Sequence, residues 1–215
     1  MTFADVNISL LEGFGITCLI FVLTLLMAIP LGLIITFGSM NKFKPIKYIF
    51  RFIVWVVRGT PLMLQVIVVF YGPGLLFDVP MSSRLLAVIV AFVINYACYF
   101  SEIYRGGIES ISKGQYEAGK VLGLSKKQIF FKIVLFQVVK RIIPPMSNEV
   151  ITLVKDTSLA RVIAVEELTR VSSQIVNVYG IIWPLFYAGL FYLIFNGLLS
   201  VLFSKLEKKL DYYKG

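Results

Sequence analysis

The sequence predicts an all-α, polytopic membrane protein. Of its 215 residues, 58% are hydrophobic and only 15% are charged, whereas about a quarter of the residues in a soluble domain are charged. Four long stretches carry no charged side chain: 13–38, 59–77, 85–101 and 171–204. A helix needs roughly 20 apolar residues to cross a bilayer, and lipid leaves no water to satisfy backbone groups outside helices or closed barrels.

Basic residues gather in alternate connections between these stretches. They cluster within 42–58, 105–132 and 205–214, while the N-terminal segment holds only Asp5 and Glu12. Since loops rich in Lys and Arg stay in the cytoplasm, we expect the N-terminus outside and the C-terminus in the cytoplasm. The net charge of +9 therefore reflects membrane topology, and no nucleic-acid partner is expected.

Five spans are expected, within a single transmembrane domain covering residues 1–215. Their approximate ranges are 13–38, 52–76, 84–104, 134–156 and 181–204. The first contains Pro30, which should kink it. The fourth is polar, because it carries Lys140-Arg141, Pro144-Pro145 and Glu149. It is needed as a span, since without it the C-terminal basic cluster would lie outside the cell.

Several kinds of chemistry are excluded by composition. The chain has no histidine, which removes Ser-His and Cys-His nucleophile pairs and histidine-rich zinc sites. Cys18 and Cys98 lie in apolar stretches without CxxC spacing, so neither a disulfide nor a metal site is expected. Residues 114–121, GQYEAGKV, contain part of a P-loop, but Val121 stands where magnesium binding requires Ser or Thr. We expect no cofactor and no catalytic site.

The loop 105–132 is predicted to contain a short helix. Two serine–glutamine pairs have the spacing of a capping box: Ser112 with Gln115, and Ser125 with Gln128. Gly123 lies between them, where a helix C-terminus favours glycine. The pattern predicts a helix over about 113–122, a tight break, and a second helix entering the membrane. Such a helix could lie on lipid headgroups or bind a partner protein.

Motifs in and around this loop resemble a known transporter family. Glu117-Ala118-Gly119, Gly123 and Ile133-Val134-Leu135 follow the spacing of the EAA signature of the membrane subunits of bacterial ATP-binding-cassette (ABC) importers. Two identities differ, since Gly119 replaces an alanine and Phe136 a proline. Gly119 should loosen the short helix by up to about 1 kcal/mol, and the loss of the proline should reshape the entry to the fourth span.

Three further motifs resemble the polar amino-acid branch of that superfamily: Arg58–Leu62, Tyr104–Ile108 and Leu153–Leu159. The resemblance covers nearly the whole chain and implies a type I ABC importer permease-like bundle in the bacterial inner membrane. It also implies partners: two ATPase subunits, a second permease copy or paralogue, an extracytoplasmic substrate-binding protein and an amino-acid substrate.

By this resemblance the short helix couples the permease to a separate ATPase, and the permease itself hydrolyses no ATP. Glu117 and Gly123 correspond most directly to the family motif, and Tyr116, Ala118 and Leu122 are inferred to fill a groove of the ATPase. The whole candidate coupling set is Gln115, Tyr116, Glu117, Ala118, Gly119, Leu122 and Gly123.

A substrate path is expected where polar residues meet at mid-membrane. Glu149 falls near the middle of the fourth span, with Asn148 beside it and Thr152 one turn away. A carboxylate at that depth costs about 2.5–3.5 kcal/mol and should face the bundle interior with a partner. That partner is either Lys140 or Arg141, or a polar cavity that Glu149 and Asn148 share with Asn95 and Tyr99.

The third-span residues Asn95 and Tyr99 also fit plain interhelical packing. No arginine or lysine is expected at the depth of Glu149, which favours a basic or neutral polar amino acid as substrate. Arg58 and Arg105 lie near expected cytoplasmic ends of spans, where they either snorkel to headgroups or brace the coupling loop.

Two other functions compete with an importer permease. A secondary transporter would need no coupling helix and usually shows inverted repeats, which the sequence lacks. A scaffold subunit that transports nothing would have no reason to keep Glu149 within the membrane.

Overall fold

The computed structural model describes residues 2–210, and every regular element in that range is helical. This confirms the all-α class. The elements in chain order are α1 (Phe3–Ser39), α2 (Lys44–Arg58), α3 (Leu62–Phe77), α4 (Arg84–Glu109), α5 (Lys113–Val121), α6 (Lys126–Ile129), the π-helix η1 (Phe130–Val134), α7 (Leu135–Asp156), the 3-10 helix η2 (Thr157–Ile163), α8 (Leu168–Tyr179) and α9 (Trp183–Leu210). Lys214, one of the basic residues counted above, lies outside the described residues.

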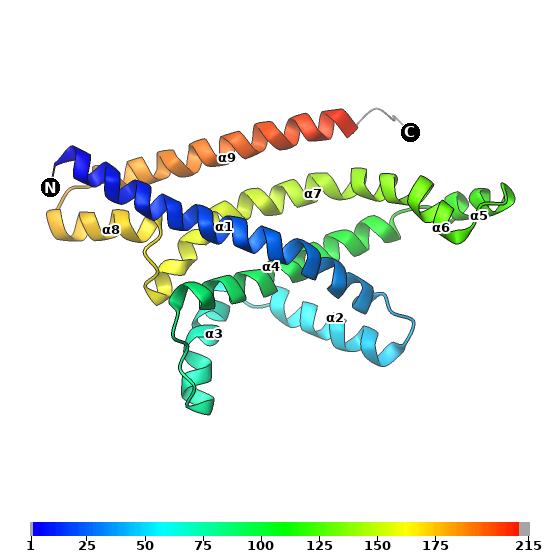
Figure 1. Cartoon of the computed structure of the whole chain (residues 1–215), viewed down its shortest axis with the longest axis horizontal. Coiled ribbons are helices and arrows are strands. Elements are labelled where there is room, and N and C mark those ends of the chain that lie inside the picture. The colour runs from blue at the N-terminus through cyan, green and yellow to red at the C-terminus, as the bar shows by residue number, and fades with distance from the viewer. Residues whose placement is uncertain (1, 211–215) are drawn as a thin grey trace.

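The long helices run along the length of the molecule. Helices α1, α4, α7 and α9 extend side by side, α3 points away from them, and α5 with α6 forms a hairpin at one end (Figure 1). Helix α1 packs on α4, and α7 packs on both α4 and α9. Close approach of α1 and α4 depends on Gly32, because a Cβ there would lie 3.0 Å from Phe100 Cβ.

The second expected span is not one helix, so the continuous range 52–76 is wrong. The chain is helical from Lys44 to Arg58, turns through 106°, and continues as α3. The break falls at Gly59-Thr60-Pro61. Pro61 has no backbone N–H to continue the helix and disfavours helical geometry in the residue before it. The signal was therefore present in the sequence, inside the motif Arg58–Leu62.

Side-chain amides hold this break. Gln65 Nε2 donates to the carbonyl oxygen of Val57 at 2.8 Å and thereby satisfies the end of α2 from the first turn of α3. Asn95 Nδ2, on α4, donates to Gln65 Oε1 at 3.0 Å. The bend is thus connected to the bundle through two amides.

Three helices are long and apolar enough to cross a membrane: α1, α4 and α9. The bent pair α2 and α3 could form a fourth, broken span. Helix α7 has 22 residues but is not among the apolar spans of the described chain, because its first half carries the charged and proline residues noted above. The count of five spans and the orientation of the termini stay predictions.

At the end opposite the hairpin lie two elements that the sequence did not predict, η2 and α8, and a buried acid caps α8. Glu167 is 0% exposed and caps α8 by accepting hydrogen bonds from the backbone N–H groups of Thr169 (2.7 Å) and Arg170 (2.8 Å). It also accepts from the Tyr192 hydroxyl at 3.2 Å. Burial of the carboxyl group raises the pKa of Glu167 above its usual value. These bonds attach α8 to α9.

Candidate functional site

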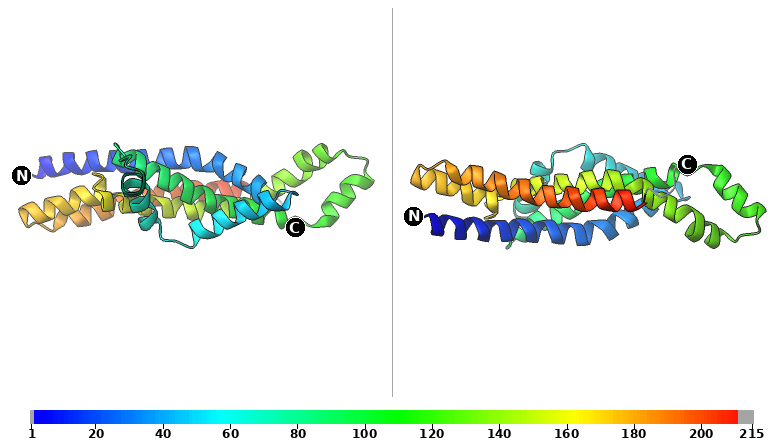
Figure 2. Two further views of the ribbon diagram at one scale, coloured as in Figure 1. Left: turned by 90° about the horizontal axis from the view of Figure 1, so that it is seen from below. Right: turned by 90° about the horizontal axis from the view of Figure 1, so that it is seen from above.

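The hairpin of α5 and α6 forms as the turn chemistry predicts. Figure 2 shows α5 and α6 projecting beyond the helix bundle. Gly123 has φ +72°. Its backbone N–H donates to the carbonyl oxygen of Lys120, and the backbone N–H of Leu124 donates to the carbonyl oxygen of Gly119 at 3.0 Å. This is the Schellman arrangement, which requires a left-handed residue just after the helix. Both the short helix and the break at Gly123 are confirmed.

Of the two expected capping boxes, one is confirmed. Ser125 and Gln128 exchange both hydrogen bonds, at 2.8 and 3.3 Å. The box at Ser112 is wrong, because Ser112 is the N-cap of α5 but makes no side-chain capping bond. Gln115 instead accepts a hydrogen bond from Gln137 Nε2 of α7 at 3.4 Å. The glutamine side chain therefore links α5 to α7 rather than closing on its own helix.

One face of α5 belongs to the protein's own core. Ile111, Ile129, Val134 and Val138 are buried together at the base of the hairpin, and the ring of Tyr116 packs against them. Gly119 is the buried residue of α5, and a Cβ there would lie 2.7 Å from Ile129 Cγ1. Tyr116 and Gly119 thus hold one face of α5 against this buried cluster.

The opposite face of α5 is free of the bundle. Glu117 and Ala118 are exposed, and so are Val121 (88%) and Leu122 (75%). We call these four residues the outer face of α5. Val121 was absent from the predicted coupling set, although it follows Glu117 at the i+4 spacing that places two side chains on one face of a helix. Two exposed aliphatic side chains next to a carboxylate form a surface suited to a protein groove.

The glycine at position 119 suits this particular hairpin, and we expect Gly119→Ala to destabilise it. The new methyl group would overlap Ile129, and overpacking of this kind costs about 1–3 kcal/mol. Because the two side chains touch, Gly119→Ala and Ile129→Ala should be non-additive: the double variant should lose less stability than the sum of the single variants. Thermal unfolding of the four purified proteins measures this, and strict additivity would contradict the contact.

The entry to α7 carries Phe136 and is helical throughout. No proline interrupts the chain, and α6 continues through the π-helical turn η1 directly into α7. A π-turn leaves a backbone carbonyl without its usual helical partner, and Gln137 Nε2 donates to the Ile133 carbonyl oxygen at 3.1 Å. Helix α6 is therefore continuous with α7, and α5 precedes it across the break at Gly123.

Polar contacts hold the end of α4. Arg141 of α7 donates to both the carbonyl oxygen and the hydroxyl of Ser110, directly after α4. Arg105 pairs with Glu109 at 2.6 Å and with both oxygens of Glu102, at 3.0 and 2.6 Å. The pairs of Arg105 lie within α4, so the bracing of the coupling loop by Arg58 and Arg105 stays a prediction.

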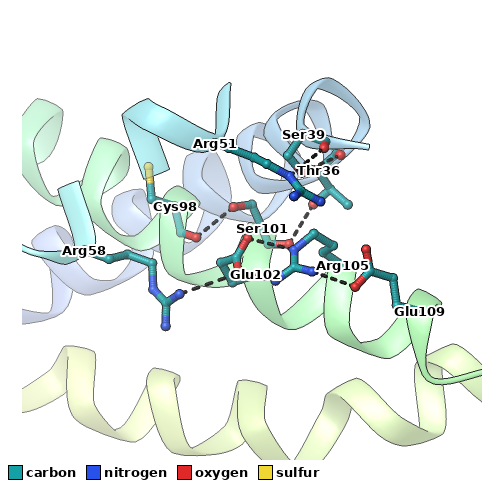
Figure 3. Close-up of polar contacts among 9 residues, drawn as sticks. All are labelled: Thr36, Ser39, Arg51, Arg58, Cys98, Ser101, Glu102, Arg105 and Glu109. Atoms are coloured by element: carbon teal, nitrogen blue, oxygen red, sulfur yellow. Dashed lines mark hydrogen bonds and ion pairs between the residues drawn. The ribbon is translucent and has the colours of Figure 1, made fainter. Parts of the chain in front are cut away.

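Arg58 is the last residue of α2 and contacts two residues of α4. Since α2 begins at Lys44, Arg58 is 14 residues along it, about 21 Å from its start. Its guanidinium group lies 3.7 Å from Glu102 and stacks over the ring of Tyr99, 5.0 Å from the centroid. Figure 3 shows Arg58 and Arg105 approaching Glu102 from opposite sides.

The expected substrate-path residues differ in their surroundings. Asn95 is 5% exposed and donates a hydrogen bond to Gln65, so it acts in packing between helices. Tyr99, Glu149 and Thr152 are partly buried, and Asn148 is exposed. Arg141 is engaged with Ser110. The expectation that no arginine or lysine lies at the depth of Glu149 stays a prediction.

The acid Asp156 of α7 also contacts α4. Its Oδ2 accepts a hydrogen bond from the buried Tyr96 hydroxyl at 2.7 Å, which joins α7 to α4. Polar contacts thus join α4 to both of its neighbours, since Arg58 of α2 lies over the ring of Tyr99.

Comparison with known proteins identifies the family. Residues 28–212 match the family described as binding-protein-dependent transport system inner membrane component. The chain belongs to this family. Among its relatives is the L-cystine transport system permease protein TcyB of Bacillus subtilis, 38% identical over 195 residues, which are 89% of this chain and 82% of the relative. The arginine transport system permease protein ArtQ of the same organism is 36% identical over 204 residues, 94% of this chain and 92% of the relative.

The glutamine transport system permease protein GlnP of Escherichia coli K12 is 34% identical with the same coverage. A solved crystal structure of an amino acid ABC transporter with histidines has a TM-score of 0.88 at 28% identity, covering 96% of both chains. The MetNI methionine ABC transporter in an inward-facing conformation has a TM-score of 0.73 at 15% identity, which supports the fold alone. The type I ABC permease fold predicted from the motifs is confirmed.

Proposed function

We propose that this chain is the transmembrane permease subunit of an ATP-driven amino-acid importer in the bacterial inner membrane. The observation that carries the proposal is the outer face of α5, an acidic and aliphatic surface held at the tip of the molecule by the protein's own core. Such a surface fits a groove of a separate ATPase subunit. The names of the relatives, which are cystine, arginine and glutamine permeases, support an amino acid as substrate.

The assembly follows from this role. Two copies of the permease, or the permease and a paralogue, enclose the path, two ATPase subunits bind the α5 helices, and an extracytoplasmic binding protein delivers a polar or basic amino acid. ATP is hydrolysed by the ATPase subunits alone. Residues 1–215 act as one transmembrane domain of five spans, counting α2 with α3 as one broken span and α7 as another, and the N-terminus lies outside.

Transport in a defined system tests the function. The permease is reconstituted in proteoliposomes with its ATPase and binding protein, and uptake of each labelled amino acid is measured with and without ATP. We expect uptake of at least one polar or basic amino acid that requires ATP hydrolysis. Uptake driven by an ion gradient without ATP would indicate a secondary transporter, and no amino-acid uptake at all would contradict the proposal.

Labelling with a membrane-impermeant thiol reagent tests the orientation. In a Cys18→Ser, Cys98→Ser background, Glu166→Cys and Lys126→Cys place single thiols at exposed positions of opposite ends. In intact cells we expect Glu166→Cys to react and Lys126→Cys to react only after the membrane is opened. The reverse pattern would invert the topology.

A further inference from the structure

A cationic pocket lies between α2 and α4, beside the break in the second span. Its volume is about 420 Å³, and Arg51, Trp55 and Arg58 line it from α2 while Glu102 and Arg105 line it from α4. Pockets that bind small molecules have volumes of about 300–1,000 Å³. The pocket is therefore large enough for a single amino acid.

The charges around this pocket do not balance. Three guanidinium groups face one carboxylate, and both oxygens of Glu102 are already taken by Arg105. Arg58 approaches Glu102 only to 3.7 Å, which is longer than a hydrogen bond. Arg51 uses Nε to donate to the Ser39 carbonyl oxygen at 3.3 Å (Figure 3). Among residues 2–210, no acceptor pairs with its two terminal nitrogens. Arg51 and Arg58 thus retain donors for an anion.

We propose that this pocket binds the α-carboxylate of the transported amino acid on the cytoplasmic side of the path. The planar donors of arginine match a carboxylate in a two-bond arrangement. This inference rests on the proposed function and extends it to a carboxylate-binding site.

The placement of the two arginines suits a passage rather than a single tight site. Arg51 and Arg58 are seven residues apart on α2, which is about two helical turns, so they lie on the same face of the helix about 10 Å apart. A carboxylate that leaves Arg58 would next meet Arg51. Arg51 lies nearer the first residues of α2, which follow α1. Glu102 lowers the affinity of the site for an anion, because its carboxylate already attracts Arg105 and Arg58.

Anion attraction is measured first, and it does not depend on transport. Trp55→Cys is introduced in a Cys18→Ser, Cys98→Ser background, in the full complex in nanodiscs. The rates of reaction with an anionic sulfonate thiol reagent and a neutral one of similar size are compared. We expect the anionic reagent to react on the order of 10-fold faster relative to the neutral one, and this preference to fall at high salt and with Arg51→Gln or Arg58→Gln. Arg84→Gln, at the far end of α4, should leave it unchanged.

Ligand protection then identifies the anion. L-arginine and L-glutamine are compared with agmatine and 4-aminobutanamide, the corresponding amines without the carboxylate, and with inorganic phosphate and phosphatidylglycerol nanodiscs. We expect the transported amino acid to slow labelling and its amine not to do so. We also expect Arg58→Gln to lower uptake at least tenfold while ATP hydrolysis and thermal unfolding are kept, with partial recovery in Arg58→Lys.

Three results would overturn the proposal. The first is the absence of an anion preference at Trp55→Cys. The second is a preference that phosphate or phosphatidylglycerol blocks but the amino acid does not, which would assign the pocket to a phosphate group. The third is equal protection by the amino acid and its amine. Failure of the proposed function is a separate outcome. In that case the complex without substitutions would show no ATP-driven uptake.

Discussion

Glu117→Lys and Val121→Asp are expected to abolish ATP-driven uptake while the permease still folds and inserts. Both side chains lie on the outer face of α5, where Val121 is 88% exposed and neither contributes to the core beneath the hairpin. Loss of an anchor residue buried at an interface commonly costs about 2–4 kcal/mol, which corresponds to roughly 30-fold to several hundred-fold weaker binding of the ATPase. Uptake and co-purification of the ATPase, measured at equal expression, check this.

The conservative changes Glu117→Gln and Val121→Leu provide the matched controls. They keep the shape of the outer face, so most of the binding should survive. The prediction fails if Glu117→Lys and Val121→Asp transport normally, and it also fails if they lower the melting temperature of the isolated permease, since that would mark the face as structural.

Gly107→Ala is expected to disrupt the packing of α4 on α7, whereas Gly106→Ala is not. A Cβ at Gly107 would fall inside the contact distance of Ile142 Cγ2, and Gly107 is buried. Gly106 is exposed, with no atom within 4 Å of an added Cβ. Overpacking at Gly107 should cost about 1–3 kcal/mol, while alanine at Gly106 should favour the helix by up to about 1 kcal/mol.

This pair of adjacent glycines tests how the hairpin is connected to the bundle. Helices α4 and α7 are the two elements that meet the hairpin, and Gly107 lies at their contact, close to the Arg141–Ser110 bonds. We expect Gly107→Ala to lower the melting temperature and to reduce uptake per hydrolysed ATP. Equal behaviour of the two alanine variants would show that the close approach at Gly107 has no role.

The hairpin could be predicted from the sequence because its structure is local. Gly123 and the Ser125–Gln128 pair determine their geometry within a few residues, so spacing alone was sufficient. The failed box at Ser112 shows the limit of this reasoning, since Gln115 found a partner 22 positions away in Gln137. Val121 was not in the predicted coupling set, although it lies one helical turn after Glu117.

The contacts between helices could not be predicted in the same way. The position of Arg58 beside Glu102 and Tyr99 depends on the bend at Pro61, and a hydropathy pattern that treats 52–76 as one span does not contain this bend. The pairing of Asn95 with Gln65, and of Tyr96 with Asp156, joins helices far apart in sequence. Such contacts depend on how helices rotate against one another, which residue spacing within each helix does not determine.

Photo-crosslinking from the outer face of α5 shows whether this helix binds the ATPase subunit. A benzophenone amino acid is placed at Val121 in the assembled complex, and the same group is placed at Arg84, at the other end of the bundle, as the control. We predict a covalent product between the permease and its ATPase subunit from Val121 and none from Arg84. A product with lipid alone from Val121, in a complex that hydrolyses ATP and transports, would contradict the account, because α5 would then lie on the membrane rather than in the ATPase.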